Sequence, residues 1–213
     1  ADPLNIVFGF NGTDALNIAI RGIVRPGDHV VTTVCDHNSV LRPLSALREA
    51  AGVEVTYVPC DGQGFVSPAD VRAAIRPDTR LVAVNHASNV TGAVQRVSEI
   101  GRLVRETDAF YLVDAAQSLG HVPLNVQAID ADLLAAPGHK GLLGPQGTGV
   151  LYIRPGVDRE VVPLRCGGTG TQSEADHQPD FLPDKYEPGN HNLSGLAGLA
   201  ASTTFLRDET IEA

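Results

Sequence analysis

The sequence repeats one arrangement: a short run of apolar and β-branched residues is followed by a longer stretch with helical spacing. Strands that alternate with helices of about ten residues form βαβ units and a mostly parallel sheet. The run Leu81-Val82-Ala83-Val84 is apolar throughout, which is typical of a strand covered on both faces. Seven such runs are predicted as strands: 5–10, 29–34, 53–58, 80–85, 110–113, 133–136 and 150–153. The sequence therefore predicts an α/β fold with three α/β/α layers around a mostly parallel seven-stranded sheet.

The predicted helices lie between these strands, at 13–24, 40–51, 67–75, 98–107 and 194–206. Ser67 followed by Pro68 is a typical helix start, and Ser98 is expected to cap the next helix in the same way. Gly52 is the expected C-cap of the second helix. From residue 156 to 191 the periodicity disappears and Pro, Gly, Asp and Gln dominate, which predicts a long irregular excursion with a functional or interface role.

Composition limits the classes of partner. The chain has 213 residues, so one domain is expected, and its formal net charge is −9. This acidity argues against a nucleic-acid partner, because phosphate-backbone binding needs a basic surface. No apolar run reaches the ~18–20 residues that cross a bilayer, so no membrane partner is expected.

The cysteines indicate a reducing, cytoplasmic location. Cys35, Cys60 and Cys166 are odd in number, widely spaced and without a CxxC pair, so a disulfide scaffold is excluded. No Cys/His spacing resembles a zinc site, and no metal is expected. Methionine is absent and an apolar run begins at Asn5, from which we expect a segment of a longer polypeptide.

Polar residues follow five of the predicted strands. Ligands of parallel α/β sheets bind outside the carboxyl ends of the strands, so these positions are the candidate site. They are Gly12-Thr13, Asp36-His37, Asn85 to Gly92 with Asn89, Asp114 with Gln117, and His139-Lys140. Several have a purely structural alternative: Thr13 and Asp114 as helix N-caps, and His37 as a surface residue.

These side chains have complementary chemistry. Gly12 and Thr13 precede a helix, where free N–H groups favour an anion. Asp114 supplies a carboxylate at the end of a buried strand, which needs a cationic partner or several donors. Lys140 lies between glycines directly after a buried strand, a setting in which lysine becomes an amine nucleophile. Pyridoxal 5′-phosphate (PLP) requires such a set of groups.

At these residues the chain resembles the class V aminotransferase family of PLP-dependent enzymes, fold type I, and most of all its cysteine desulfurase and selenocysteine lyase branch. The matching stretches are 11–17, 36–43, 86–92, 114–117 and 138–147, followed by 167–170 and 187–192. The resemblance implies a PLP-binding large domain over 1–213, without the family's N-terminal segment and small C-terminal domain.

The resemblance also implies residue roles. Lys140 would form a Schiff base with PLP, Asp114 would pair with the pyridine nitrogen, and His37 would stack on the ring and act in acid–base steps. Gln117 would hydrogen-bond the phenolic oxygen, and Asn89 would lie near that oxygen or the substrate carboxylate. Gly12, Thr13 and His139 would hold the phosphate, with Asn190 reaching the phosphate of a neighbouring subunit.

The implied activity is a PLP-dependent reaction on an amino acid: cysteine desulfuration to alanine, with sulfur transfer to an acceptor protein, in a homodimer. An aminotransferase, an epimerase, a β-lyase and a non-catalytic PLP-fold interaction protein remain open as alternatives. The sequence departs from the family at Pro137, where Ser or Thr is usual, and at Asn190, where Thr is usual. The lost donor at Pro137 is expected to weaken PLP binding rather than abolish it.

Overall fold

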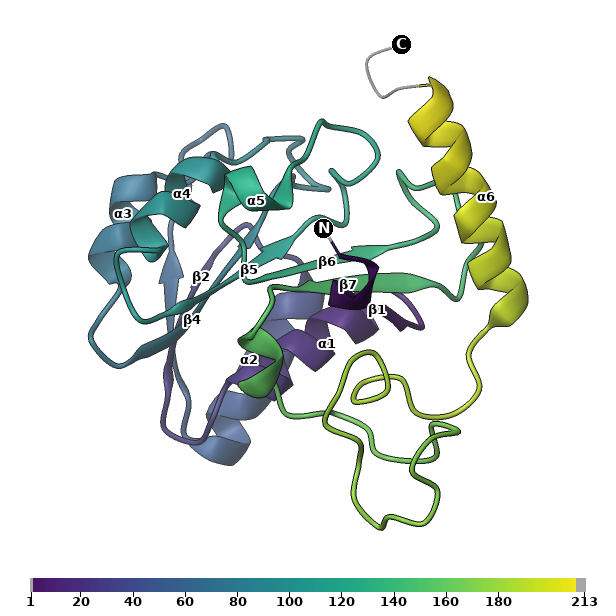
Figure 1. Ribbon diagram of the computed structural model, residues 1–213. Coiled ribbons are helices and arrows are strands. Elements are labelled where there is room, and N and C mark those ends of the chain that lie inside the picture. Colours follow the sequence, from purple (N-terminus) through teal and green to yellow (C-terminus); the bar gives the residue numbers. More distant parts are fainter. Residues whose placement is uncertain (1, 210–213) are drawn as a thin grey trace.

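The computed structural model describes residues 2–209 and joins seven strands into one sheet (Figure 1). The strands are β1 (Ile6–Gly9), β2 (His29–Thr33), β3 (Glu54–Val58), β4 (Thr79–Asn85), β5 (Phe110–Asp114), β6 (Leu133–Pro137) and β7 (Gly149–Ile153). Their order across the sheet is β1-β7-β6-β5-β4-β2-β3. Strands β2 to β6 are parallel, and only β7 runs antiparallel to its neighbours β1 and β6. The predicted mostly parallel sheet is confirmed.

Helices cover both faces of this sheet. They are η1 (Pro3–Asn5), α1 (Gly12–Ile23), α2 (Asn38–Ala51), α3 (Pro68–Ala74), α4 (Val97–Val104), α5 (Val126–Ile129), η2 (Val157–Arg159) and α6 (Leu193–Glu209). Figure 1 shows α1 and α2 under one face and α3, α4 and α5 over the other, so the three-layer prediction is confirmed. No helix in residues 2–209 combines the length and the apolar character needed to cross a membrane.

Two hydrophobic cores lie between the layers, and strand alternation divides the residues between them. In β4, Leu81 and Ala83 join the core between the sheet and the helices α1 and α2. Val82 and Val84 join the core between the sheet and the helices α3 and α4. Successive side chains of a strand point to opposite faces, so a wholly apolar strand feeds two cores at once. Burial of the strands on both faces holds their carboxyl ends in place, and these ends line the cavity described below.

The helix ends agree with the sequence at two positions and differ at a third. Ser67 Oγ accepts from the Asp70 N–H, 3.3 Å away, and Gly52 ends α2 with φ of 65°. The prediction for Ser98 is wrong: α4 begins at Val97, and its N-cap is Arg96, which makes no side-chain cap bond. Burial of Val97 and Ile100 sets where this helix begins, which local capping preference could not show.

The predicted irregular excursion is confirmed, since only the three-residue η2 interrupts it. Tyr186 attaches it to the body of the protein: the ring is 2% exposed, and its hydroxyl lies 2.9 Å from both the Asp158 and Val161 carbonyls. Glu187 Oε1 accepts from the Phe8 N–H, 2.7 Å away, which covers part of the edge strand β1.

Candidate functional site at the carboxyl edge of the sheet

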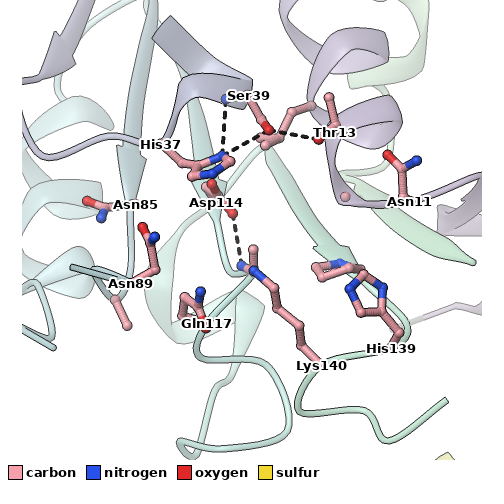
Figure 2. A pocket seen from close by; sticks show the side chains of 15 residues that line it. Asn11, Thr13, His37, Ser39, Asn85, Asn89, Asp114, Gln117, His139 and Lys140 are labelled. Carbon is pink, nitrogen blue, oxygen red and sulfur yellow. Dashed lines mark hydrogen bonds between the residues drawn. The ribbon is translucent and has the colours of Figure 1, made fainter. Parts of the chain in front are cut away.

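The carboxyl ends of the central strands and the N-terminus of α1 enclose a cavity of about 260 Å³ (Figure 2). It is lined by Asn11, Gly12, Thr13, Leu16, His37, Ser39, Asn85, Ala87, Asn89, Asp114, Ala116, Gln117, Pro137, His139 and Lys140. Every residue to which the resemblance gives a role lies here except Asn190, whereas Asp36 lies outside the lining. Residues from five separate stretches of the sequence therefore meet in one place, as the parallel topology requires.

Asp114 and Lys140 come from adjacent strands. Parallel pairing of β5 and β6 brings their carboxyl ends to the same edge, where Asp114 ends β5 and Lys140 follows β6. Asp114 is 4% exposed, and its Oδ1 accepts from the Ala116 N–H, 2.9 Å away. Burial raises the pKa of Asp114, while that N–H and the charges of His37 and Lys140 oppose the rise. The half-buried Lys140 amine thus shares the cavity with a carboxyl group that has few polar partners.

His37 is held by the first turn of α2, for which it is the N-cap. Its Nδ1 accepts from the Ser39 N–H at 3.1 Å and lies 2.9 Å from Ser39 Oγ. Since Nδ1 is an acceptor, the neutral ring carries its proton on Nε2. Ser39 Oγ also lies 2.7 Å from Thr13 Oγ1, which connects the first turns of α1 and α2.

The start of α1 has the features of an anion cradle. Asn11, rather than Thr13, is the N-cap, and its Oδ1 accepts from the Asp14 N–H at 2.9 Å. The N–H groups of Gly12 and Thr13 donate to no other described residue. A Cβ on Gly12 would lie 2.9 Å from Pro137 Cδ, so the close approach of the two segments requires glycine. Free N–H groups, the helix dipole and the Thr13 hydroxyl all favour an anion.

Asn190 lies apart from this cavity. It is exposed in the loop that precedes α6 and does not line the wall. Its role toward a neighbouring subunit stays a prediction.

Two further polar residues line the cavity that sequence reasoning did not select, Asn11 and Ser39, and Asn85 was included there only as the first residue of the stretch 85–92. Each had a local signal. Asn11 and Ser39 stand at helix starts, and Asn85 ends β4 in register with Asp114.

The architecture and the cavity define the class: an α/β protein with a small-molecule site at the carboxyl edge of a mostly parallel sheet, furnished with an amine, a buried carboxyl group and an anion cradle. The chain matches the family description "Aminotransferase class-V" over residues 1–213. It belongs to the class-V aminotransferase family.

Relatives within the family point to one branch. The chain is 46% identical over 205 residues to a probable cysteine desulfurase of Methanothermobacter thermautotrophicus, covering 94% of this chain and 51% of that protein. The solved apo structure of a cysteine desulfurase from Thermococcus onnurineus NA1 is similar with a TM-score of 0.90 at 34% identity, over 98% of this chain and 53% of that one. The structure of SspA in complex with cysteine is similar with a TM-score of 0.85 at 31% identity, over 96% and 56%.

These similarities confirm the predicted family, its desulfurase-like branch and the fold-type I architecture. The chain spans about half the length of the relatives it matches.

Proposed function

We propose that this chain binds PLP in the cavity at the carboxyl edge and is the cofactor-binding domain of a cysteine desulfurase-like enzyme. The observation that carries the proposal is that Lys140 and Asp114 line the same cavity as the anion cradle of α1. Bound PLP would supply a carbonyl carbon for Schiff-base exchange and a ring that accepts electrons from the substrate. Relatives named as cysteine desulfurases, and SspA with its bound cysteine, support L-cysteine as the substrate.

The donor set fits the cofactor. A dianionic phosphate suits the free N–H groups of Gly12 and Thr13, and His139 lines the same cavity. The aromatic ring of His37 suits a flat heterocycle. Asp114 Oδ2 accepts no hydrogen bond from the described residues, so it is free to accept the proton of a pyridinium nitrogen. Pro137 lines the cavity and has no side-chain hydroxyl, so the Ser or Thr donor that the family usually has here is missing.

Each of the polar side chains in the cavity then has a separate role in the proposed reaction. The Lys140 Nζ would bind the cofactor and afterwards hold and return the substrate's α-proton. Asp114 would keep the ring nitrogen protonated, because its burial makes an unpaired charge costly and a paired one strongly attractive. Gln117 and Asn89 would orient the ring through their amides, and His37 would move a proton through Nε2.

Assembly and location follow from the same proposal. A homodimer would bring Asn190 of a second copy towards the phosphate, and a sulfur-acceptor protein would take the product sulfur. The cysteine content fits the reducing cytoplasm.

The chain contains only two lysines, Lys140 and Lys185, which makes a sharp test available. Lys185 lies away from the cavity, with its Nζ 2.7 Å from Asp180 and 2.8 Å from the Asp158 carbonyl. We expect PLP followed by borohydride to label Lys140 alone in peptide mass spectra. Lys140→Ala should abolish the visible absorbance of the bound cofactor, and Lys185→Arg should retain it. Label on Lys185, or an unchanged spectrum in Lys140→Ala, would refute the assignment.

The alternative chemistries are separated by substrate. Formation of alanine from cysteine, with sulfide released when an added thiol reductant reduces the persulfide product, supports the desulfurase. Amino transfer from alanine to glyoxylate without cysteine turnover supports an aminotransferase. Binding of PLP with turnover of neither substrate would favour the interaction protein.

A further inference from the structure

Asp36 is a buried carboxyl group next to the cavity that does not line it. Its exposure is 6%, and it directly precedes His37 in the turn between β2 and α2. Its Oδ2 accepts three hydrogen bonds, all from neutral donors: Thr32 Oγ1 at 3.0 Å, the Thr33 N–H at 2.8 Å and Thr33 Oγ1 at 2.7 Å. The Asp36 side chain therefore ties the turn that contains His37 to the end of β2.

The other oxygen has no partner. Oδ1 of Asp36 is fully buried and makes no hydrogen bond, and the same is true of Oδ1 of Asn85. Asn85 is 3% exposed, lines the cavity and donates its amide to the Cys35 carbonyl, 3.1 Å away. The Asn85 amide therefore lies against the same turn, and two buried acceptors there lack a donor. Unsatisfied buried oxygens are rare because each costs a lost hydrogen bond.

One proton would satisfy both oxygens. A carboxylic acid donates from one oxygen and still accepts at the other, whereas a carboxylate only accepts. We propose that Asp36 is a positioning residue that fixes the His37 turn, and that it does so as a carboxylic acid donating from Oδ1 to the side-chain carbonyl of Asn85.

The electrostatic surroundings agree. Burial raises the pKa of Asp36 to about 6, the three hydrogen bonds from Thr32 and Thr33 oppose the rise, and the charge of Asp114 adds to it. The other titratable groups that face Asp36 are Tyr111 of β5 and Cys35 in the same turn, and for each of them the Asp36 charge raises the pKa. None of these neighbours is a cation, so only the hydrogen bonds from Thr32 and Thr33 stabilise the ionised form.

The protonation state can be measured without any cofactor. In the intact protein, the carboxyl ¹³C resonance of Asp36, identified by its absence in Asp36→Asn, should titrate with a midpoint near pH 6. A midpoint near ~4, the value of an ordinary aspartate, would overturn the acid form. This measurement is independent of the proposed function.

The positioning role is tested through PLP affinity and therefore rests on the proposed function. Asp36→Asn keeps a donor for Asn85 and an acceptor for the threonines, so at about pH 5.5 it should bind PLP within about twofold of wild type. Asp36→Ala loses both and should bind at least about tenfold more weakly. As the pH rises to about 8 the wild-type acid ionises, so Asp36→Asn should come to bind more tightly than wild type.

The matched control is Asp132→Asn. Asp132 is also buried, but it directly precedes β6 at the amino ends of the parallel strands, away from the cavity. There it pairs with Arg105 at 3.0 Å and Arg154 at 3.2 Å. The PLP affinity of the Asp132→Asn protein, relative to wild type, should not change with pH, even if the variant is less stable. Equal weakening of Asp36→Asn and Asp36→Ala at about pH 5.5, or an equal pH effect in Asp132→Asn, would overturn the role.

Discussion

Two aspartates at the cavity edge show how the surroundings of a carboxyl group decide its chemistry. Asp114 and Asp36 are 4% and 6% exposed, and burial raises the pKa of both. Asp114 has the amine of Lys140 across the cavity, which favours its charged form. Asp36 accepts hydrogen bonds only from hydroxyl groups and a backbone N–H, and the nearby Asp114 charge favours its neutral form. The first is therefore suited to hold a cation and the second to hold a proton.

The raised pKa of Asp36 predicts a stability that depends on pH. Native Asp36 keeps its proton up to about pH 6, whereas the unfolded chain releases it near its ordinary value of 3.8. Between these values the native state binds more protons, so the free energy of unfolding falls as the pH rises, and it is level above pH 6. A shift of this size corresponds to about 3 kcal/mol.

Urea denaturation of wild type and Asp36→Asn across this range checks the prediction. The wild-type free energy of unfolding, relative to the variant, should fall by roughly 2 kcal/mol between pH 4 and pH 7. A constant difference between the two proteins would show that Asp36 ionises normally in the native state.

At the scale of single elements, capping distinguishes two serines that look alike in the sequence. Ser67 caps α3 through its side chain, whereas Ser98 lies inside the first turn of α4 and its hydroxyl makes no hydrogen bond with a described residue. Ser67→Ala should lower the free energy of unfolding by ~1 kcal/mol. Ser98→Ala should change it by less than ~0.5 kcal/mol, as is usual for exposed positions. Equal effects in thermal or urea unfolding would contradict the assignment of the caps.

The α1 and α2 helices illustrate how neighbouring elements build the site together. Their first turns are joined by the hydrogen bonds of Ser39 to Thr13 and His37. The two helix starts therefore support each other, and a change in one is expected to move the other.

At the scale of the whole molecule, the irregular excursion depends on a few anchors. Tyr186 donates its hydroxyl to the carbonyls of Asp158 and Val161, and Arg165 lies 3.1 Å from Asp14 and over the Phe10 ring. These contacts attach a segment with little secondary structure to the rim of the sheet.

Removing the Tyr186 anchor should loosen the irregular excursion while the sheet stays folded. Tyr186→Phe leaves the buried Val161 carbonyl without its donor, whereas the Asp158 carbonyl keeps the Lys185 amine. The change should cost about 1–3 kcal/mol in the free energy of unfolding. Limited proteolysis within 166–184 should become faster. Tyr57→Phe is the control, because Tyr57 is 36% exposed and its hydroxyl makes no hydrogen bond with a described residue. Equal protease sensitivity of the two variants would argue against the anchor.

Much of this molecule could be predicted from the sequence. Apolar runs such as 81–84 determine the strands, because a strand buried on both faces must be apolar throughout. The polar residues that follow those runs determine the candidate site, because parallel strands deliver their carboxyl ends to one edge. In this way Thr13, His37, Asp114 and Lys140 could be brought together before any coordinates.

The remaining features depend on contacts between segments far apart in the sequence, and only the tertiary structure decided them. The start of α4 follows the burial of Val97 and Ile100, not the cap preference of Ser98. The need for glycine at position 12 comes from the approach of Pro137, and the state of Asp36 comes from Asn85 and Asp114. Burial and pairing are properties of neighbours in space, and a linear sequence does not state which neighbours meet.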